Sequence, residues 1–175
     1  MKDFIRQKLR ESMDVTIPTY DMPEKIQATP EEYQALKSLT WQDIGLEPKE
    51  NSGSPIFHID ITFRNPELNK FASSIVFSIQ MLPDRKDNYK YYHPHMFISD
   101  ELQGIGIGSK ILKAFVMDFG HIYVSKARTH NPNFTKMVLG LGNDPDMELL
   151  RNNRAILVLK NGNPDKEDLS KIIQL

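Results

Sequence analysis

The chain has 175 residues, and its 22 lysines and arginines nearly balance its 23 aspartates and glutamates, giving a formal net charge of −1. This length fits one domain with a sizeable core, and the balanced charge argues against a protein that binds nucleic acid through bulk positive charge. The absence of cysteine excludes disulfides, thiolate catalysis and zinc sites with cysteine ligands.

The first 28 residues predict a separate N-terminal unit. Residues 1–13 form a basic amphipathic helix and residues 14–28 form an extended linker. The apolar stripe of that helix holds Phe4, Ile5, Leu9 and Met13, and its basic residues are Lys2, Arg6, Lys8 and Arg10. We expect the helix to dock on its own domain, on a neighbouring subunit or on another protein assembly. It is loosely similar to the N-terminal capsid-targeting peptides of tailed bacteriophages, which implies a virion as an alternative location.

A helix is predicted to begin after Thr29. Thr29 is the cap, Pro30 takes the first turn, and Glu32 completes a capping box. Residues 41–46 are expected to form a second short helix, which Pro48 ends.

Three strands are predicted to follow. Residues 56–64 and 71–82 alternate apolar and polar side chains, which is typical of half-buried antiparallel strands. Residues 84–90 read as a charged hairpin tip, and residues 91–99 as the third strand.

The second half of the chain is predicted to alternate helices and strands. In order, these are a helix at 109–120, a strand at 121–127, a helix at 134–141, strands at 147–150 and 155–160, and a C-terminal helix within 163–175. The whole pattern favours an α/β fold of the α+β type, with a mixed, mostly antiparallel sheet flanked by helices. No apolar run approaches membrane-spanning length and no signal segment is evident, so we expect a soluble, cytoplasmic protein with no membrane partner.

A glycine-rich loop joins the strand at 91–99 to the helix at 109–120. Its residues 103–108 read Gln-Gly-Ile-Gly-Ile-Gly. A strand that turns through glycines into a helix presents bare N–H groups and the positive end of the helix dipole to an anion. The spacing does not fit the dinucleotide fingerprint, and Ser109-Lys110 inverts the P-loop order. A plain tight turn is the alternative.

The spacing Gln-x-x-Gly-x-Gly at Gln103, Gly106 and Gly108 resembles the acetyl-CoA pyrophosphate loop of the GNAT (N-acetyltransferase) superfamily. The preceding residues 99–101, Ser-Asp-Glu, are also similar to that family. The resemblance implies an acyl-CoA-binding domain over residues 29–162, with acetyl-CoA as cosubstrate. It implies transfer of acetyl to an amine of a small molecule, a protein N-terminus or a lysine.

The resemblance also implies which residues would hold the cosubstrate. In the family, N–H groups of the loop bind the pyrophosphate, the preceding strand pairs with the pantetheine arm, and an asparagine after the next strand contacts CoA. The residues that correspond here are Met96, Phe97, Ile98, Gln103, Gly104, Ile105, Gly106, Ile107, Gly108, Ser109 and Asn131, with Asn133 as the second choice for the asparagine.

His93 and His95 are the candidate bases. Two residues apart on a strand, they point to one face, and an imidazole can take the proton that an ammonium must lose before it attacks a thioester. Some arylalkylamine acetyltransferases carry a similar His-x-His. The alternative is a hydrated pair of edge-strand histidines. Two histidines alone leave a zinc site incomplete, so no metal is expected.

In the GNAT family a side chain often gives a proton to the CoA thiolate as it leaves, and this chain lacks the residue expected for that role. The family often has a tyrosine on the helix after the asparagine, and counting from Asn131 places Val138 there. Tyr123 and Tyr91 are the possible substitutes. The sequence therefore supports two functions: an acetyl-CoA-dependent N-acetyltransferase, or a non-catalytic GNAT-fold structural or interaction protein, possibly of a phage virion.

Overall fold

The computed structural model describes residues 22–49, 54–83 and 89–174. The predicted helix at 1–13, most of the linker at 14–28 and most of the hairpin tip at 84–90 lie outside these residues. Residues 22–28 form neither helix nor strand, and they are tied to the domain where Glu24 N donates to Ser73 O at 2.9 Å. Among the described helices, none is long and apolar enough to cross a membrane.

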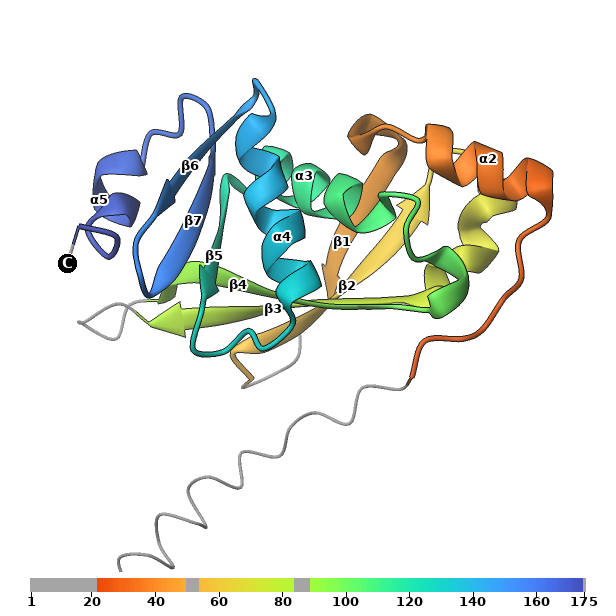
Figure 1. The fold of residues 1–175 in the computed structure, drawn as a ribbon, viewed down its shortest axis with the longest axis horizontal. Coiled ribbons are helices and arrows are strands. Elements are labelled where there is room, and N and C mark those ends of the chain that lie inside the picture. Colours follow the sequence, from red (N-terminus) through yellow and green to blue (C-terminus); the bar gives the residue numbers. More distant parts are fainter. Residues whose placement is uncertain (1–21, 50–53, 84–88, 175) are drawn as a thin grey trace, which may run out of the picture.

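The fold is α+β, with antiparallel sheets flanked by helices, as predicted (Figure 1). The first sheet has the order β1-β2-β3-β4, with β1 at Ile44–Lys49, β2 at Ile56–Phe63, β3 at Ile75–Pro83 and β4 at Tyr89–Ile98. The second has the order β5-β7-β6, with β5 at His121–Ser125, β6 at Met147–Arg151 and β7 at Ala155–Lys160. The strands that we expected in one mixed sheet thus form two sheets, and the break along the chain lies between β4 and β5.

Four α-helices lie within the described residues: α2 at Pro30–Ser38, α3 at Ile107–Phe119, α4 at Pro132–Gly140 and α5 at Lys166–Ser170. Figure 1 shows α2, α3 and α4 on one side of the four-stranded sheet and α5 beside the three-stranded sheet. The start of α2 confirms the predicted capping box, because Thr29 Oγ1 accepts from Glu32 N at 3.2 Å and Glu32 Oε2 accepts from Thr29 N at 3.0 Å.

Two predictions of local structure were wrong in part. Only the first half of the helix predicted at 41–46 forms: Trp41–Asp43 is a short 3₁₀ helix, and Ile44 already begins β1. This strand is at the edge of its sheet, a position in which Pro48 is tolerated. The first residues of the strand predicted at 71–82 belong instead to the 3₁₀ helix Pro66–Ser74, from which Phe71 is fully buried.

The main core lies between the four-stranded sheet and α3. Phe115 of α3 is at its centre, with ring centroids 5.8 Å from Phe77, 5.8 Å from Tyr92 and 4.5 Å from Phe119. A smaller apolar cluster on the other face of the three-stranded sheet includes Leu82, Tyr91, Tyr123, Leu157, Leu159 and Leu169. The faces of β4 and β5 are therefore packed into two different clusters.

The edges of the two sheets meet at β4 and β5. Tyr92 of β4 stacks on His121 of β5 with centroids 4.7 Å apart, and the Tyr91 and Tyr123 rings are 5.2 Å apart. These aromatic contacts hold the first residues of the two strands together. The opposite end of β4, at Met96 and Ile98, borders a hollow instead.

Candidate functional site

The glycine loop has the backbone geometry of an anion site. Gly104 and Gly106 have φ of 82° and 79°, in the left-handed region that favours glycine. Gly106 caps α3 with no side-chain hydrogen bond, and Lys110 N makes the first bond of the helix, to Gly106 O. The N–H groups of residues 107–109 therefore have no acceptor within the helix, and they point from the positive end of its dipole.

A hollow of about 520 Å³ lies beside this loop. It is bounded by the end of β4, the glycine loop, the first turn of α3 and one face of α4. Its lining residues are Met96, Ile98, Leu102, Gln103, Gly104, Gly106, Ile107, Gly108, Asn131, Asn133, Phe134 and Met137. Backbone N–H donors thus face an apolar wall, a combination that suits a ligand with both an anionic group and an uncharged arm.

At Gly108 the first turn of α3 packs closely against both walls of this hollow. A Cβ at this position would lie 2.8 Å from Met137 Sδ and 3.1 Å from Ile98 Cδ1. The small residue therefore permits the first turn of α3 to approach both α4 and β4.

Two amide side chains shape the walls. Gln103 Nε2 donates to Ile98 O and to Asp100 Oδ1, each at 3.0 Å, and so ties the loop to the end of β4. Asn131 Oδ1 accepts from Asn133 N at 3.0 Å and from Phe134 N at 3.4 Å, which caps α4. Both residues line the hollow, and both also hold its boundaries in place.

The structure brings most of the predicted cofactor residues to this hollow, with three exceptions. Phe97 points to the opposite face of β4 and is 52% exposed, and Ile105 is buried in the core. Ser109 lines a neighbouring hollow. Sequence reasoning missed Leu102, Phe134 and Met137. The last two are three residues apart on α4, a spacing that places them on one face of a helix.

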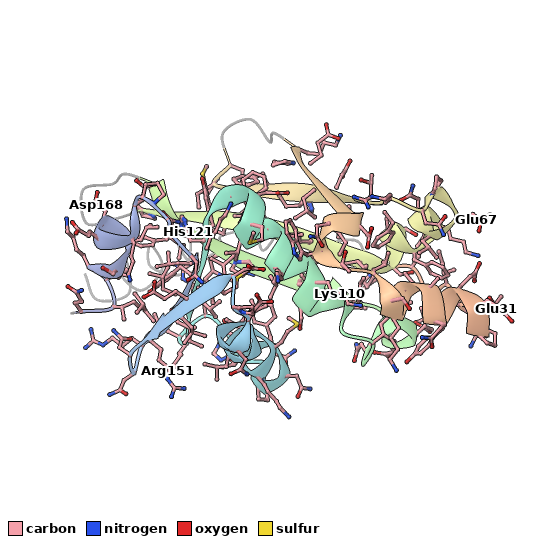
Figure 2. All side chains as sticks on the ribbon, turned by 90° about the horizontal axis from the view of Figure 1, so that it is seen from above. Glu31, Glu67, Lys110, His121, Arg151 and Asp168 are labelled. Carbon is pink, nitrogen blue, oxygen red and sulfur yellow. The ribbon has the colours of Figure 1, made fainter. Side chains whose placement is uncertain are left out.

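A second hollow, of about 540 Å³, lies between α3 and α4 and shares Asn133 and Met137 with the first. Three lysines and Trp41 are among its lining residues. Lys110 Nζ points toward α2 and donates to Lys37 O at 2.5 Å (Figure 2), and burial lowers its pKa. The other two lysines are Lys113 and Lys136. The two hollows therefore adjoin at Asn133 and Met137.

The histidine pair lies on the face of β4 that points away from α3. The His93 and His95 rings are stacked with centroids 4.9 Å apart, so the predicted shared face is confirmed. Burial, and then the neighbouring His95 and Arg128, together lower the pKa of His93 to about 4. Burial, and then Arg128, also lower the pKa of His95. Both rings are therefore neutral at pH 7.

The hydrogen-bond partners assign the tautomers. His93 Nδ1 lies 3.1 Å from Pro94 O, and a carbonyl only accepts, so this nitrogen carries the proton. The lone pair of His93 Nε2 is buried and has no protein partner. Gln80 Oε1 lies 3.3 Å from His95 Nε2 and accepts from Arg128 Nη1 at 3.2 Å. A guanidinium only donates, which fixes that amide oxygen as an acceptor. His95 is therefore protonated on Nε2 and has a lone pair on Nδ1.

The predicted tyrosine and valine positions lie away from the first hollow. Tyr123 is on β5 in the smaller apolar cluster, where burial raises its pKa. Val138 is fully buried in the main core. Among the described residues that line the first hollow there is no tyrosine.

No metal centre is formed by the described part of the chain, in which three or more histidines or carboxylates do not gather around one point. In comparisons with known proteins, no protein-family model matches the chain, and no curated protein matches it.

Proposed function

We propose that the chain is an acetyl-CoA-dependent N-acetyltransferase of the GNAT type. The observation that carries this proposal is the hollow at the end of β4, where the glycine loop and the N-terminus of α3 present backbone N–H groups beside an apolar wall. CoA joins a pyrophosphate to a long uncharged arm, which fits this combination. The N–H groups of residues 104–109 would bind the pyrophosphate, and the arm would lie along Met96 and Ile98.

The second hollow supports CoA over a smaller anion. It adjoins the first at Asn133 and Met137, and it offers the ammonium of Lys136 and the indole ring of Trp41. The other two lysines are engaged, since Lys113 is paired with Asp144 at 2.6 Å and Lys110 donates to Lys37 O. Lysines suit a phosphate, and an aromatic side chain suits a purine base. The 3′-phosphate and adenine of CoA would account for both features.

The acceptor amine would approach from the histidine face of β4. His95 would take one proton from the ammonium through its Nδ1 lone pair. The amine nitrogen then bonds to the acetyl carbonyl carbon and gives up its second proton, the carbon–sulfur bond breaks, and CoA leaves as a thiolate that takes up a proton. His93 is the alternative base, and Tyr123 stays the candidate donor of that last proton.

A second candidate function is a non-catalytic structural or interaction protein on the same scaffold. The buried Val138, together with the absence of a tyrosine from the described lining of the first hollow, favours it. Such a protein would keep the glycine loop but lack a proton donor near the thioester.

Two assays distinguish these functions. Calorimetric titration with acetyl-CoA tests binding, and release of free thiol in the presence of a panel of amines tests transfer. Binding together with amine-dependent thiol release supports the enzyme, whereas binding without transfer favours the second candidate. If millimolar acetyl-CoA gives no heat of binding, the CoA proposal is wrong.

A further inference from the structure

Arg128 places a positive charge beside the histidine pair. It follows β5 in a turn closed by Arg128 N donating to Ser125 O at 3.1 Å, and its side chain reaches across to Gln80 of β3. In the described ranges no carboxylate lies within salt-bridge distance of this guanidinium. Its remaining N–H groups are available to a bound anion.

The charge of Arg128 acts on the groups around it. It lowers the pKa of His93 and of His95, and it opposes the rise that burial causes in the pKa of Tyr123. Asp60 of β2, an acid on the same face of the four-stranded sheet, is engaged by Lys49 of β1 at 3.2 Å. His58 also lies on this face, in register with Ser78 and through it with His95.

We propose, as an extension of the proposed acetyltransferase function, that the acceptor is a free α-amino acid whose carboxylate binds Arg128 while its amine faces His95. Gln80 Oε1 accepts from Arg128 Nη1 at 3.2 Å and from His95 Nε2 at 3.3 Å, so the guanidinium lies close to the imidazole ring whose other nitrogen, Nδ1, is the base. In an α-amino acid the amine and the carboxylate are attached to the same carbon. The acceptor would thus match the pairing of a base and a cation.

Electrostatics favours this class over a plain amine. An ammonium with no carboxylate would bring its positive charge toward Arg128 and be repelled. A carboxylate that pairs with the guanidinium forms a charge-assisted hydrogen bond and neutralises that charge. Neutralising the charge of Arg128 also removes one cause of the lowered pKa of His95. Binding of the correct acceptor would therefore raise the pKa of the base that deprotonates it.

Matched acceptors test the proposal kinetically. Phenylalanine, histidine and leucine are compared with phenethylamine, histamine and isoamylamine, which lack the carboxylate. The proposal predicts a kcat/KM higher by about tenfold or more for the amino acids. Arg128→Gln should lower their kcat/KM by about tenfold or more, and should raise that of the amines about twofold because a like charge is lost. Arg151→Gln, on β6 (Figure 2), is the matched control and should change neither.

An NMR titration of the imidazoles separates this inference from the proposed function, because it needs neither CoA nor turnover. Phenylalanine should raise the pKa of His95 in the wild type but not in Arg128→Gln, and phenethylamine should not raise it in either. If that result holds without acetyl transfer to any acceptor, the site stands and the enzyme proposal fails. If amines are acetylated as well as amino acids, and Arg128→Gln changes neither rate, the carboxylate site is wrong and the enzyme stands. If no transfer occurs and His95 does not respond, both are overturned.

Discussion

The two faces of β4 are built in different ways. The face toward α3 carries Met96 and Ile98 and leads to a hollow whose polar groups are the backbone N–H groups of the loop and the side-chain amides of Gln103, Asn131 and Asn133. The polar groups of the opposite face are the imidazole side chains of His93 and His95. Pro94 O holds the first and Gln80 holds the second. Because side chains alternate along a strand, consecutive residues serve two surfaces. Under the proposed function, the cosubstrate and the acceptor would bind on opposite faces of this strand.

This difference predicts how each face responds to substitution. On the loop face the side chains matter less than the backbone conformation, so changes at left-handed glycines should have the largest effects. On the histidine face the chemistry depends on protonation, so its changes should appear in pH dependence. The following predictions test this contrast, from the largest expected effect to the smallest.

Removing the shared support should affect both faces together. Phe115→Ala deletes the ring that packs on Phe77 of β3 and Tyr92 of β4, and should lower the free energy of unfolding by about 3–5 kcal/mol. Chemical denaturation measures this. Tyr33→Ala, at an exposed position on α2, is the control and should cost less than about 1 kcal/mol. Equal losses in the two variants would contradict the central position of Phe115.

Gly106→Asp should affect the loop face alone. A side chain at φ of 79° costs about 1–2 kcal/mol of stability, and a carboxylate in the anion site should lower CoA affinity by about a hundredfold or more. Calorimetric titration measures the affinity. Gly162→Asp is a matched control, since Gly162 also has positive φ and open space around it but lies in the turn before α5. The account fails here if both variants bind CoA equally well.

His93 should make stability depend on pH. Its pKa is about 4 in the folded protein and 6.5 as a free group, so between these values the unfolded chain binds more protons. Neutral His93 therefore makes its full contribution to the free energy of unfolding above pH 6.5. That free energy falls as the pH falls, by about 3 kcal/mol at pH 4. Urea denaturation across this range should show a flatter pH profile for His93→Gln than for the wild type. Ile122→Val, in the core, should instead lower stability by about 0.5–1.5 kcal/mol at every pH. Parallel profiles for the wild type and His93→Gln would show that His93 titrates normally.

The smallest effect should come from the second hollow, which Lys136 lines. If Lys136 contacts the 3′-phosphate, Lys136→Gln should weaken CoA binding about threefold, while dephospho-CoA, which lacks that phosphate, should bind as before. Lys126→Gln is the control, because Lys126 Nζ binds Asn152 O elsewhere on the surface. A loss of the same size for both ligands would argue against phosphate contact at Lys136.

Local signals predicted much of the fold. The capping box at Thr29, the alternation along β2 and the glycine loop before α3 each depend on near neighbours in sequence. The alternation that placed the histidines on one face also predicts that Phe97 points away from the hollow, because Phe97 follows His95 by two residues and so lies on the same face of the strand.

What the sequence did not predict depends on tertiary contacts. β1 takes its strand conformation by pairing with β2, which overrides the helical appearance of residues 41–46. The bond between Arg128 and Gln80 joins residues 48 apart in sequence, and no local pattern signals it. The wall that Met137 gives to the hollow likewise follows from how closely α4 approaches Gly108.

The most direct test of the separation between the two faces is an NMR titration of the isotopically labelled wild-type protein with CoA, recording backbone amides and imidazoles in the same samples. The account predicts saturable shifts at the amides of residues 104–109, Met96 and Ile98, with much smaller changes at the His93 and His95 imidazoles. Shifts that centre on the imidazoles and leave the loop amides unchanged would contradict it.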